Sequence, residues 1–231
     1  MQCEIIAIGT ELLLGQIQDT NSSWLGENLA LIGIDNYYQT KIGDNETRIV
    51  NAIRLALSRS DAVVCCGGLG PTQDDITREA IAKATNSELY LDEKVVKKIE
   101  QMFSSRGRHM TLNNLKQAMI PEGGLAIEDQ PGTAPGIIFP FKDKVIYAVP
   151  GVPYELKQIM RSTILPDMKK RSGSTTLIKS RTLRTWGHTE SKLAELLEAK
   201  IEKLDQSDDT TLAFLASGIE GLKLRITVKG K

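Results

Sequence analysis

The sequence contains few of the residues on which disulfide-stabilised proteins and histidine-based metal sites depend. It has three cysteines in 231 residues, and two of them, Cys65 and Cys66, are adjacent, which is poor geometry for a disulfide or a metal site. We therefore expect these two to be small core residues in a reducing cytoplasm. His109 and His188 have no Cys or His partner at ligand spacing, which favours a surface role over metal binding or acid–base catalysis.

An excess of charge and long apolar runs are also absent. Lys plus Arg and Asp plus Glu both number 29, and this balance favours neither nucleic acid nor a membrane as a partner. No apolar stretch approaches the roughly 18 to 20 residues that cross a bilayer, and the amino terminus shows no secretion-signal pattern. We therefore expect a soluble cytoplasmic protein. A hydrophobic content of 41% is sufficient for a folded core.

What the sequence does contain is a glycine-rich loop between an apolar run and a helical pattern. Residues 62–65 are typical of a short buried strand, and Gly67-Gly68-Leu69-Gly70 follows it. Glycines let backbone amides approach a ligand, and the next helix N-terminus offers further N–H groups, so an anion site is predicted. Asp74 and Asp75 would repel a phosphate there unless a cation lay between them. The loop therefore predicts phosphate plus a divalent metal, or else a tight turn in which one Asp caps the helix.

Strand-like and helix-like segments alternate through the first part of the chain. We expect strands at residues 3–8, 34–40 and 61–65, and two intervening helices, of which the second carries the stripe Ile49, Ala52, Ile53, Ala56 and Leu57. This alternation is typical of right-handed crossovers and a parallel sheet covered on both faces. Ligands bind beyond the carboxyl ends of the strands of such sheets, where Glu11, Asp44 and the glycine loop fall.

The rest of the chain indicates further helices, a hairpin and a smaller second unit. Helices are expected at residues 92–106, 113–119 and 154–168, the last with Pro166 near its end or bending it, and a hairpin at residues 137–149. Residues 171–174 are the expected linker. Beyond it, residues 176–186, 191–204 and 222–229 read as strand, helix and strand, a small β-α-β unit whose last strand should lie near a sheet edge.

Taken together, the motifs resemble those of the CinA family (competence/damage-inducible protein A), whose amino-terminal domain is similar to the molybdopterin-binding proteins of molybdenum-cofactor biosynthesis. Several spaced motifs in one order make the resemblance specific. They are Gly9-Thr10-Glu11-Leu12-Leu13-Leu14-Gly15, Asn21, Gly43-Asp44-Asn45, Gly67-Gly68-Leu69-Gly70-Pro71-Thr72 with Asp74-Asp75-Ile76-Thr77-Arg78, Asn113-Asn114 with Gln117-Ala118, Pro121-Glu122-Gly123, Gly132-Thr133-Ala134-Pro135-Gly136 and Pro150-Gly151-Val152-Pro153. Residues 176–231 resemble the KH-type small domain that follows in this family.

The resemblance implies a fold. It is an α/β fold, with a three-layer, mostly parallel sheet of the molybdopterin-binding (MogA/MoaB-like) type over residues 1–170 and a small α+β KH-like domain over residues 176–231. Longer members also carry a nicotinamide-nucleotide amidase domain, which these 231 residues do not include, so deamidase activity is not carried over.

An activity is implied as well. It is metal-dependent hydrolysis of ADP-ribose to AMP and ribose 5-phosphate, with Mg²⁺, Mn²⁺ or Co²⁺ as the cofactor. The alternative is a non-catalytic module that binds molybdopterin or another nucleotide. Leu69 stands where the molybdopterin binders have a threonine, and the missing hydroxyl makes pterin binding the weaker interpretation.

The candidate catalytic and metal-binding residues are carboxylates at strand ends. Asp44 and Asp75 match acidic positions of the molybdopterin-binding relatives, and we expect them to hold the metal or activate water, with helix capping as the alternative. Asp74 is a third catalytic candidate, or it faces solvent. Glu11 is expected to hold the metal or a ribose hydroxyl, although a first-turn glutamate stabilised by the helix dipole explains it nearly as well.

The candidate substrate-binding residues are mainly polar. Arg78 is expected to bind phosphate with two hydrogen bonds, or to pair with Asp74 on the helix surface. Asn21, Asn113 and Asn114 are expected to contact the base or ribose, or else to cap helices. The substrate-binding set is completed by Gly67, Gly68, Gly70, Thr72 and Thr133, together with Glu11.

The small second unit sets the expectations about partners. Its KH-like character alone does not predict RNA binding. A unit of about 55 residues buries too little of its surface to be comfortably stable alone. Because family members look dimeric, we expect a homodimer with twofold symmetry and a small nucleotide, ADP-ribose, as the ligand.

Overall fold

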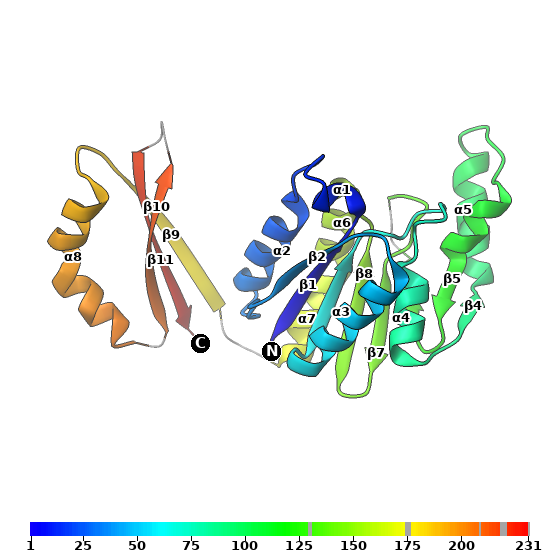
Figure 1. Cartoon of the computed structure of the whole chain (residues 1–231), viewed down its shortest axis with the longest axis horizontal. Helices are drawn as coiled ribbons and strands as arrows, with labels where there is room; N and C mark the ends of the chain where they lie inside the picture. Colours follow the sequence, from blue (N-terminus) through cyan, green and yellow to red (C-terminus); the bar gives the residue numbers. More distant parts are fainter. Residues whose placement is uncertain (129–130, 174–176, 208, 218–220, 231) are drawn as a thin grey trace. The chain divides into compact units, whose positions relative to one another are not determined.

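The computed structural model describes residues 1–128, 131–173, 177–207, 209–217 and 221–230 (Figure 1). The chain divides into two compact units, one of Met1–Leu29 with Ile34–Ser172 and the other of Ala30–Gly33 with Gly173–Lys231. The expected linker and the start of the strand after it fall partly on residues 174–176, which lie outside the described residues. Among the described residues, no helix has both the length and the apolar character needed to cross a membrane.

A six-stranded sheet forms the centre of the first unit. Four of its strands pair in parallel, and the two at one side pair antiparallel. Its first and third strands along the chain are buried over their whole length, which explains their nearly continuous apolar sequences. The predicted α/β fold with a mostly parallel sheet is therefore confirmed. In sheet order the strands are β2 (Gln39–Ile42), β1 (Cys3–Ile8), β3 (Ala62–Cys66), β8 (Lys144–Val149), β7 (Ile137–Phe141) and β6 (Leu125–Ala126).

Helices cover both faces of this sheet. The helices described up to Ser172, some of which lie away from this sheet, are α1 (Thr10–Leu13), α2 (Thr20–Leu31), α3 (Glu46–Arg59), α4 (Thr77–Thr85), α5 (Glu93–Ser104), the 3-10 helix η1 (Leu112–Ala118), α6 (Pro153–Ile159), the π-helical segment η2 (Met160–Ile164) and α7 (Leu165–Ser172). α3 and α4 lie in front of the sheet and α7 behind it (Figure 1). Ile53 of α3 and Ile81 of α4 share one core cluster with Ile6 and Val63. On the other face, Tyr147 of β8 donates a hydrogen bond to Asp167 of α7 at 2.7 Å.

A small two-stranded sheet stands at one end of the first unit. It pairs β4 (Leu89–Leu91) with β5 (Met119–Pro121) in antiparallel register, next to α5 (Figure 1). Val95 and Ile99 of α5 pack with Ala118 at the end of η1. This lobe places η1, with its polar side chains, beside the loop that follows β3, because the Lys116 ammonium binds the Thr72 carbonyl at 3.1 Å.

In the described residues after Gly173, the second unit has a three-stranded antiparallel sheet and one helix. The expected β-α-β unit is wrong in two respects: it lacks β10, and the strand of residues 222–229 lies in the centre of the sheet. β11 exchanges hydrogen bonds with a strand on each side, so its alternating pattern reflects one covered face and not an edge position. The elements are β9 (Leu177–Thr185), α8 (Glu190–Asp205), β10 (Thr210–Ser217) and β11 (Gly221–Gly230), in the sheet order β10-β11-β9.

Two further expectations about the first unit need correction. The predicted strand at residues 34–40 begins only at Gln39, because the Asn36 side chain donates to the Cys3 and Tyr38 carbonyls at 2.8 and 3.1 Å and holds an irregular segment. The helix expected at residues 154–168, with Pro166 near its end or bending it, instead runs from Pro153 to Ser172 and changes to a π-helical segment just before the proline. The wider turn of η2 precedes the proline and can accommodate its missing N–H, and the chain remains helical to Ser172.

The cysteines follow their expectation. Cys3, Cys65 and Cys66 are all free thiols, and each is at most 4% exposed. Cys65 and Cys66 are core residues of β3, as predicted, and Cys3 is a core residue of β1.

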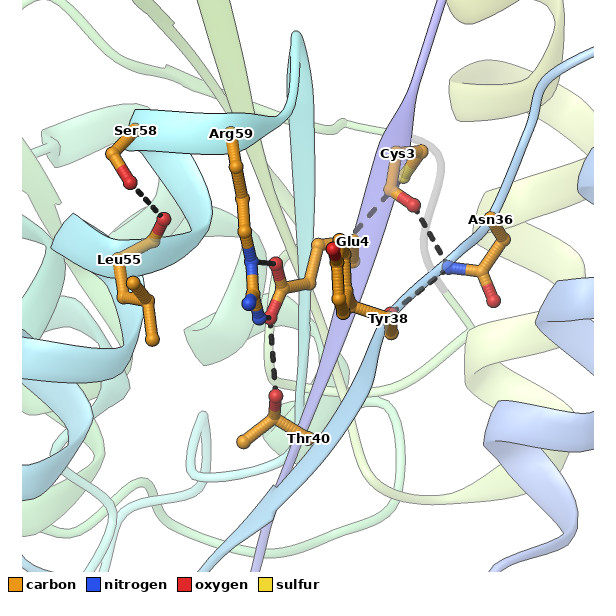
Figure 2. A network of polar contacts seen from close by, with 8 residues as sticks. All are labelled: Cys3, Glu4, Asn36, Tyr38, Thr40, Leu55, Ser58 and Arg59. Carbon is orange, nitrogen blue, oxygen red and sulfur yellow. Dashed lines mark hydrogen bonds and ion pairs between the residues drawn. The ribbon is translucent and has the colours of Figure 1, made fainter.

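An ion pair between half-buried Arg59 and buried Glu4 joins β1, β2 and α3. Glu4 is 1% exposed, and Arg59 donates from Nε and Nη2 to its two carboxylate oxygens, both at 2.8 Å. The Thr40 hydroxyl donates to Oε1 at 3.0 Å, and the Arg59 guanidinium lies 3.6 Å from the centre of the Tyr38 ring (Figure 2). The hydrogen bonds to Glu4 raise the pKa of Arg59 above its usual value. Arg59 compensates the charge of a carboxylate that would otherwise be buried without a cation in an apolar strand.

Replacing Arg59 should therefore destabilise the first unit. In Arg59→Met the Glu4 carboxylate stays buried without its cation, so the melting temperature should fall by several degrees in a thermal scan. Arg48→Met, on an exposed position of the same helix, is the matched control and should change it little. The double variant Glu4→Leu/Arg59→Met should recover most of the loss. Equal melting temperatures for the Arg59 and Arg48 variants would contradict this role.

Candidate active site

A pocket of about 430 Å³ opens at the carboxyl edge of the parallel strands. Its wall includes Ile8 at the end of β1, Asp44 after β2, Gly67 after β3 and Pro150 after β8. This is the edge at which the sequence predicts ligand binding. Most of the polar lining comes from turns that leave these strands.

The glycine loop after β3 is held against the end of β1. Gly67 has φ 106°, and a Cβ there would overlap the carbonyl oxygen of Ile8, so no other residue fits without displacing the strand. Gly68 has φ 66°, and a Cβ there would overlap the Thr77 hydroxyl. The Gly67 N–H also donates to the Val149 carbonyl at 3.0 Å. The loop is thus fixed against both neighbours of β3.

Three carbonyls of this loop point into the protein. The Gly67 carbonyl accepts from the Thr77 hydroxyl at 2.7 Å and the Gly68 carbonyl from the Thr77 N–H at 3.1 Å. The Leu69 carbonyl accepts from Nη2 of Arg78 at 2.5 Å. In a planar trans peptide the next N–H points in the opposite direction. The amides of residues 68–70 therefore face the pocket that these residues line, as an anion site requires.

Arg78 lies beneath the loop. Its side chain is fully buried, and burial lowers its pKa to about 10, while the charges of Glu79 and Asp75 act in the opposite sense. Nε and Nη1 have no partner among the described residues. The expected surface pairing with Asp74 is wrong because the guanidinium points inward, and Arg78 does not line the pocket. It places a positive charge under the outward-facing amides.

The two central aspartates are each held through one oxygen. Oδ2 of Asp75 accepts from the Thr72 N–H at 2.9 Å and from its hydroxyl at 2.5 Å. Oδ2 of Asp44 accepts from the N–H and hydroxyl of Thr10, both at 2.8 Å. Thus each Oδ1 is available to a ligand. Capping of α4 by Asp74 or Asp75 is wrong, because Ile76 occupies the N-cap position and Asp75 is turned back toward the loop.

Two glutamates and Asp74 add further carboxylates to the pocket wall. The Glu11 side chain folds over Gly9, where a Cβ would stand 2.6 Å from its Oε1, and so it faces the pocket. Glu155, in the first turn of α6, packs against Gly132 in the same way, and burial raises its pKa. Thr72 and, to a smaller extent, Lys116 lower the pKa of Asp74.

The remaining predicted residues divide between the pocket and its supports. Thr133 lines the pocket, whereas Thr72 supports Asp75. Asn21 donates to the Gly151 carbonyl at 2.7 Å and so braces the turn after β8. Asn113 is exposed on η1 and does not line the pocket, while its neighbour Asn114 is buried.

Sequence reasoning missed two pocket residues. Glu155 follows the Pro150-Gly151-Val152-Pro153 turn, and an acidic residue at the start of a helix that leaves a strand end was the available signal. Gln117 is 1% exposed and reaches the pocket from η1. The sequence shows Gln117 in a motif with Asn113, Asn114 and Ala118. The direction in which its side chain points depends on the packing of a 3-10 helix, which the motif does not reveal.

The donor chemistry of the wall fits a hard divalent cation. Glu11, Asp44, Asp74, Asp75 and Glu155 all line the pocket and offer oxygen. In the part of the chain that the structure describes, no three acidic, His or Cys side chains come together as a ready-made metal site. Mg²⁺ is commonly held by one or two carboxylates with substrate phosphates and water as the other ligands, so this open arrangement suits it.

Family models match both units of the chain. A family described as "Probable molybdopterin binding domain" matches residues 4–170, and one described as "Damage-inducible protein CinA KH domain" matches residues 180–231. A competence-damage inducible protein of Clostridium beijerinckii is 45% identical over 231 residues, covering 100% of this chain and 55% of the relative. A CinA-like protein of Frankia casuarinae is 39% identical over 236 residues, with 100% and 54% covered. The chain thus spans about half the length of these relatives.

Solved structures agree with this assignment. The crystal structure of the protein CinA from Thermoplasma acidophilum superposes with a TM-score of 0.66 at 35% identity, over 71% of this chain and 95% of that one. The molybdopterin biosynthesis enzyme MoaB of Thermus thermophilus superposes with a TM-score of 0.51 at 17% identity, over 75% and 97%. The second likeness supports the fold alone.

Gly67→Ala tests the close contact between the loop and β1. A side chain there meets both a left-handed backbone and the Ile8 carbonyl, so the free energy of unfolding should fall by about 3 kcal/mol. Gly123→Ala is the control, because Gly123 has φ 90° and a Cβ there would meet no described atom within 4 Å. It should cost only the strain of the left-handed backbone, about 1–2 kcal/mol. Denaturant titration measures both; equal losses would show that the carbonyl contact is unimportant.

Proposed function

The chain belongs to the CinA family, and on this basis we propose that its first unit hydrolyses ADP-ribose to AMP and ribose 5-phosphate with the help of a divalent cation. One observation carries the proposal: backbone amides suited to an anion and several carboxylates line the same pocket. The pocket volume of about 430 Å³ is in the range of small-molecule sites.

The opposing charges of the wall favour a metal-bound phosphate. The amides of residues 68–70 and the cation of Arg78 attract an anion, whereas Asp44 and Asp75 repel it. A cation between carboxylate and phosphate satisfies both sides. A diphosphate offers oxygens to the amides and to the cation at once, which a neutral ligand does not.

Each group of the chain then has a distinct part in the reaction. The loop amides accept the charge that develops on the attacked phosphate. One or two of the carboxylates Asp44, Asp75 and Glu11 would hold Mg²⁺, Mn²⁺ or Co²⁺, with phosphate oxygens and water as its other ligands. Such a cation would polarise phosphate oxygens and lower the pKa of bound water. Thr10 and Thr72 fix the two aspartates, so the free carboxylate oxygens keep one orientation toward the ligand.

Neutralising either aspartate should abolish most of the hydrolysis. With ADP-ribose and each of the three metals, Asp75→Asn and Asp44→Asn should release AMP about 10²- to 10³-fold more slowly than wild type. Asp143→Asn, in the exposed turn between β7 and β8, should retain full activity, and chelation of the metal should stop wild type. If wild type releases no AMP with any of these metals, the hydrolase proposal fails.

The non-catalytic alternative gives the opposite result in a binding experiment. A binding module needs the amides but not the carboxylates, so Asp44→Asn would leave affinity unchanged or improve it. Calorimetry with molybdopterin and with ADP-ribose distinguishes the two. Tight molybdopterin binding without any hydrolysis would favour a binding module.

Glu155 should give the pocket a pH dependence of its own. Burial raises its pKa, so it becomes neutral at a higher pH than an ordinary glutamate, and an anion should then bind better. Both phosphates of ADP-ribose are esterified, so its charge is constant over this range. Without metal, affinity should rise about fivefold below this pKa, the effect of one charge at about 4 Å in water. Glu155→Gln should bind tightly at neutral pH and lack this rise, whereas exposed Glu122→Gln should behave as wild type in calorimetry; a rise that survives in Glu155→Gln would exclude Glu155.

A further inference from the structure

A chain of hydrogen-bonded polar side chains leads from exposed Thr111, at the start of η1, through two buried amides to the pocket. It runs through Thr111, Asn114, Gln117 and Thr133, and its two central members are 7% and 1% exposed. Gln117 and Thr133 also line the pocket. Buried side-chain amides are nearly always hydrogen-bonded, so their hydrogen-bond partners fix the orientation of Asn114 and Gln117.

The direction of every hydrogen bond in this chain follows from one backbone group. The Thr111 N–H lies 3.2 Å from Asn114, and because an N–H can only donate, the Asn114 atom facing it is the carbonyl oxygen Oδ1. The other Asn114 atom is therefore the amide Nδ2, which donates to Gln117 Oε1 at 3.0 Å. Gln117 must then present Nε2 to Thr133, and it donates to the hydroxyl at 3.1 Å.

The last step determines what Thr133 can do. Its oxygen accepts from Gln117, so its own hydrogen must point away from Gln117, on a residue that forms part of the pocket wall. A hydroxyl that accepts one hydrogen bond becomes a better donor through polarisation along the chain. We propose that Asn114 and Gln117 are positioning residues that fix the Thr133 hydroxyl as a hydrogen-bond donor to an acceptor oxygen of the ligand.

The chemistry identifies the ligand atom. An acceptor oxygen without a hydrogen of its own, such as a phosphate oxygen or a sugar ring oxygen, satisfies a fixed donor. A group that must itself donate to Thr133 finds its hydrogen opposed by that of the hydroxyl. The inference rests on the proposed function only for the choice of ADP-ribose as the ligand to be tested.

A double-mutant cycle tests the proposal. The ligand is a non-hydrolysable methylene analogue of ADP-ribose with Mg²⁺, and affinity is measured by calorimetry. Thr133→Val, which keeps the shape and removes the hydroxyl, should weaken binding about tenfold, and Thr133→Ser should bind like wild type. Gln117→Met should weaken binding severalfold in wild type and not at all when Val occupies position 133, because its effect passes through the hydroxyl. Equal losses in both backgrounds would overturn the positioning role.

A second variant reverses the chain without removing it. In Gln117→Glu the carboxylate still accepts from Asn114 but cannot donate, so it captures the Thr133 hydrogen and withdraws it from the ligand. This variant should bind about as weakly as Thr133→Val, and combining it with Thr133→Val should add only the repulsion of the new charge. Melting curves identify any variant that has failed to fold. If a Gln117 variant fails to fold, the difference in affinity between Thr133→Val and Thr133→Ser still tests whether the Thr133 hydroxyl contacts the ligand. A Gln117→Glu variant that binds like wild type contradicts the proposal.

The failure of the proposed function is distinguishable from the failure of this inference. If wild type does not bind the ADP-ribose analogue, the same variants are measured with methylenediphosphonate and Mg²⁺, which carry only the phosphate oxygens. The same non-additive pattern there would support the Thr133 donor without ADP-ribose as the substrate. Absence of binding of either ligand to wild type would overturn both.

Discussion

The approach of Gly67 to the Ile8 carbonyl is the contact on which the arrangement of the pocket depends. It brings the loop after β3 against the end of β1, in a place where any side chain would overlap backbone. From that position Thr77 and Arg78 can bind the three loop carbonyls, and the following amides are turned outward as a result. The same turn folds Asp75 back onto Gly70 and Thr72. Anion-binding amides and a fixed carboxylate are therefore two results of one backbone conformation.

The site also combines negative charges on the pocket wall with a positive charge buried beneath the glycine loop. Carboxylates form the outer wall, and Arg78 lies fully buried below with only one guanidinium nitrogen bound to a described partner. Its pKa of about 10 still leaves it charged near neutral pH. A buried cation is costly unless something compensates it, and the nearby charges of Asp75 and Glu79 do so in part. The loop amides thus sit between a fixed positive charge and an acidic wall, an environment that an anion bridged by a cation completes.

Sequence patterns predicted the elements whose residues are uniform in character. The apolar runs of β1 and β3 and the stripe of α3 needed no long-range information, and Asn45 caps α3 as a local signal indicates. The location of Asp44 and the glycine loop at one sheet edge followed from the rule for parallel strands. What failed depended on contacts between distant segments: Asn36 binds β1 and delays β2, and Arg78 turns inward to Leu69. The central place of β11 depends on its pairing with β10, which the alternating pattern of β11 alone does not show. Gln117 reached the pocket through packing that no local pattern encodes.

The three cysteines provide a built-in chemical reporter of opening. Burial raises the pKa of Cys65 and Cys66 to about 12, so almost no reactive thiolate exists while the sheet is closed. Cys66 ends β3 just before the glycine loop and receives the Asn21 amide at 3.5 Å. A thiol reagent can modify it only when this end of the strand separates from its neighbours. The rate of its alkylation therefore measures how often the end of β3, next to pocket-lining Gly67, opens, and a ligand that binds only the closed form slows that rate without any label being introduced.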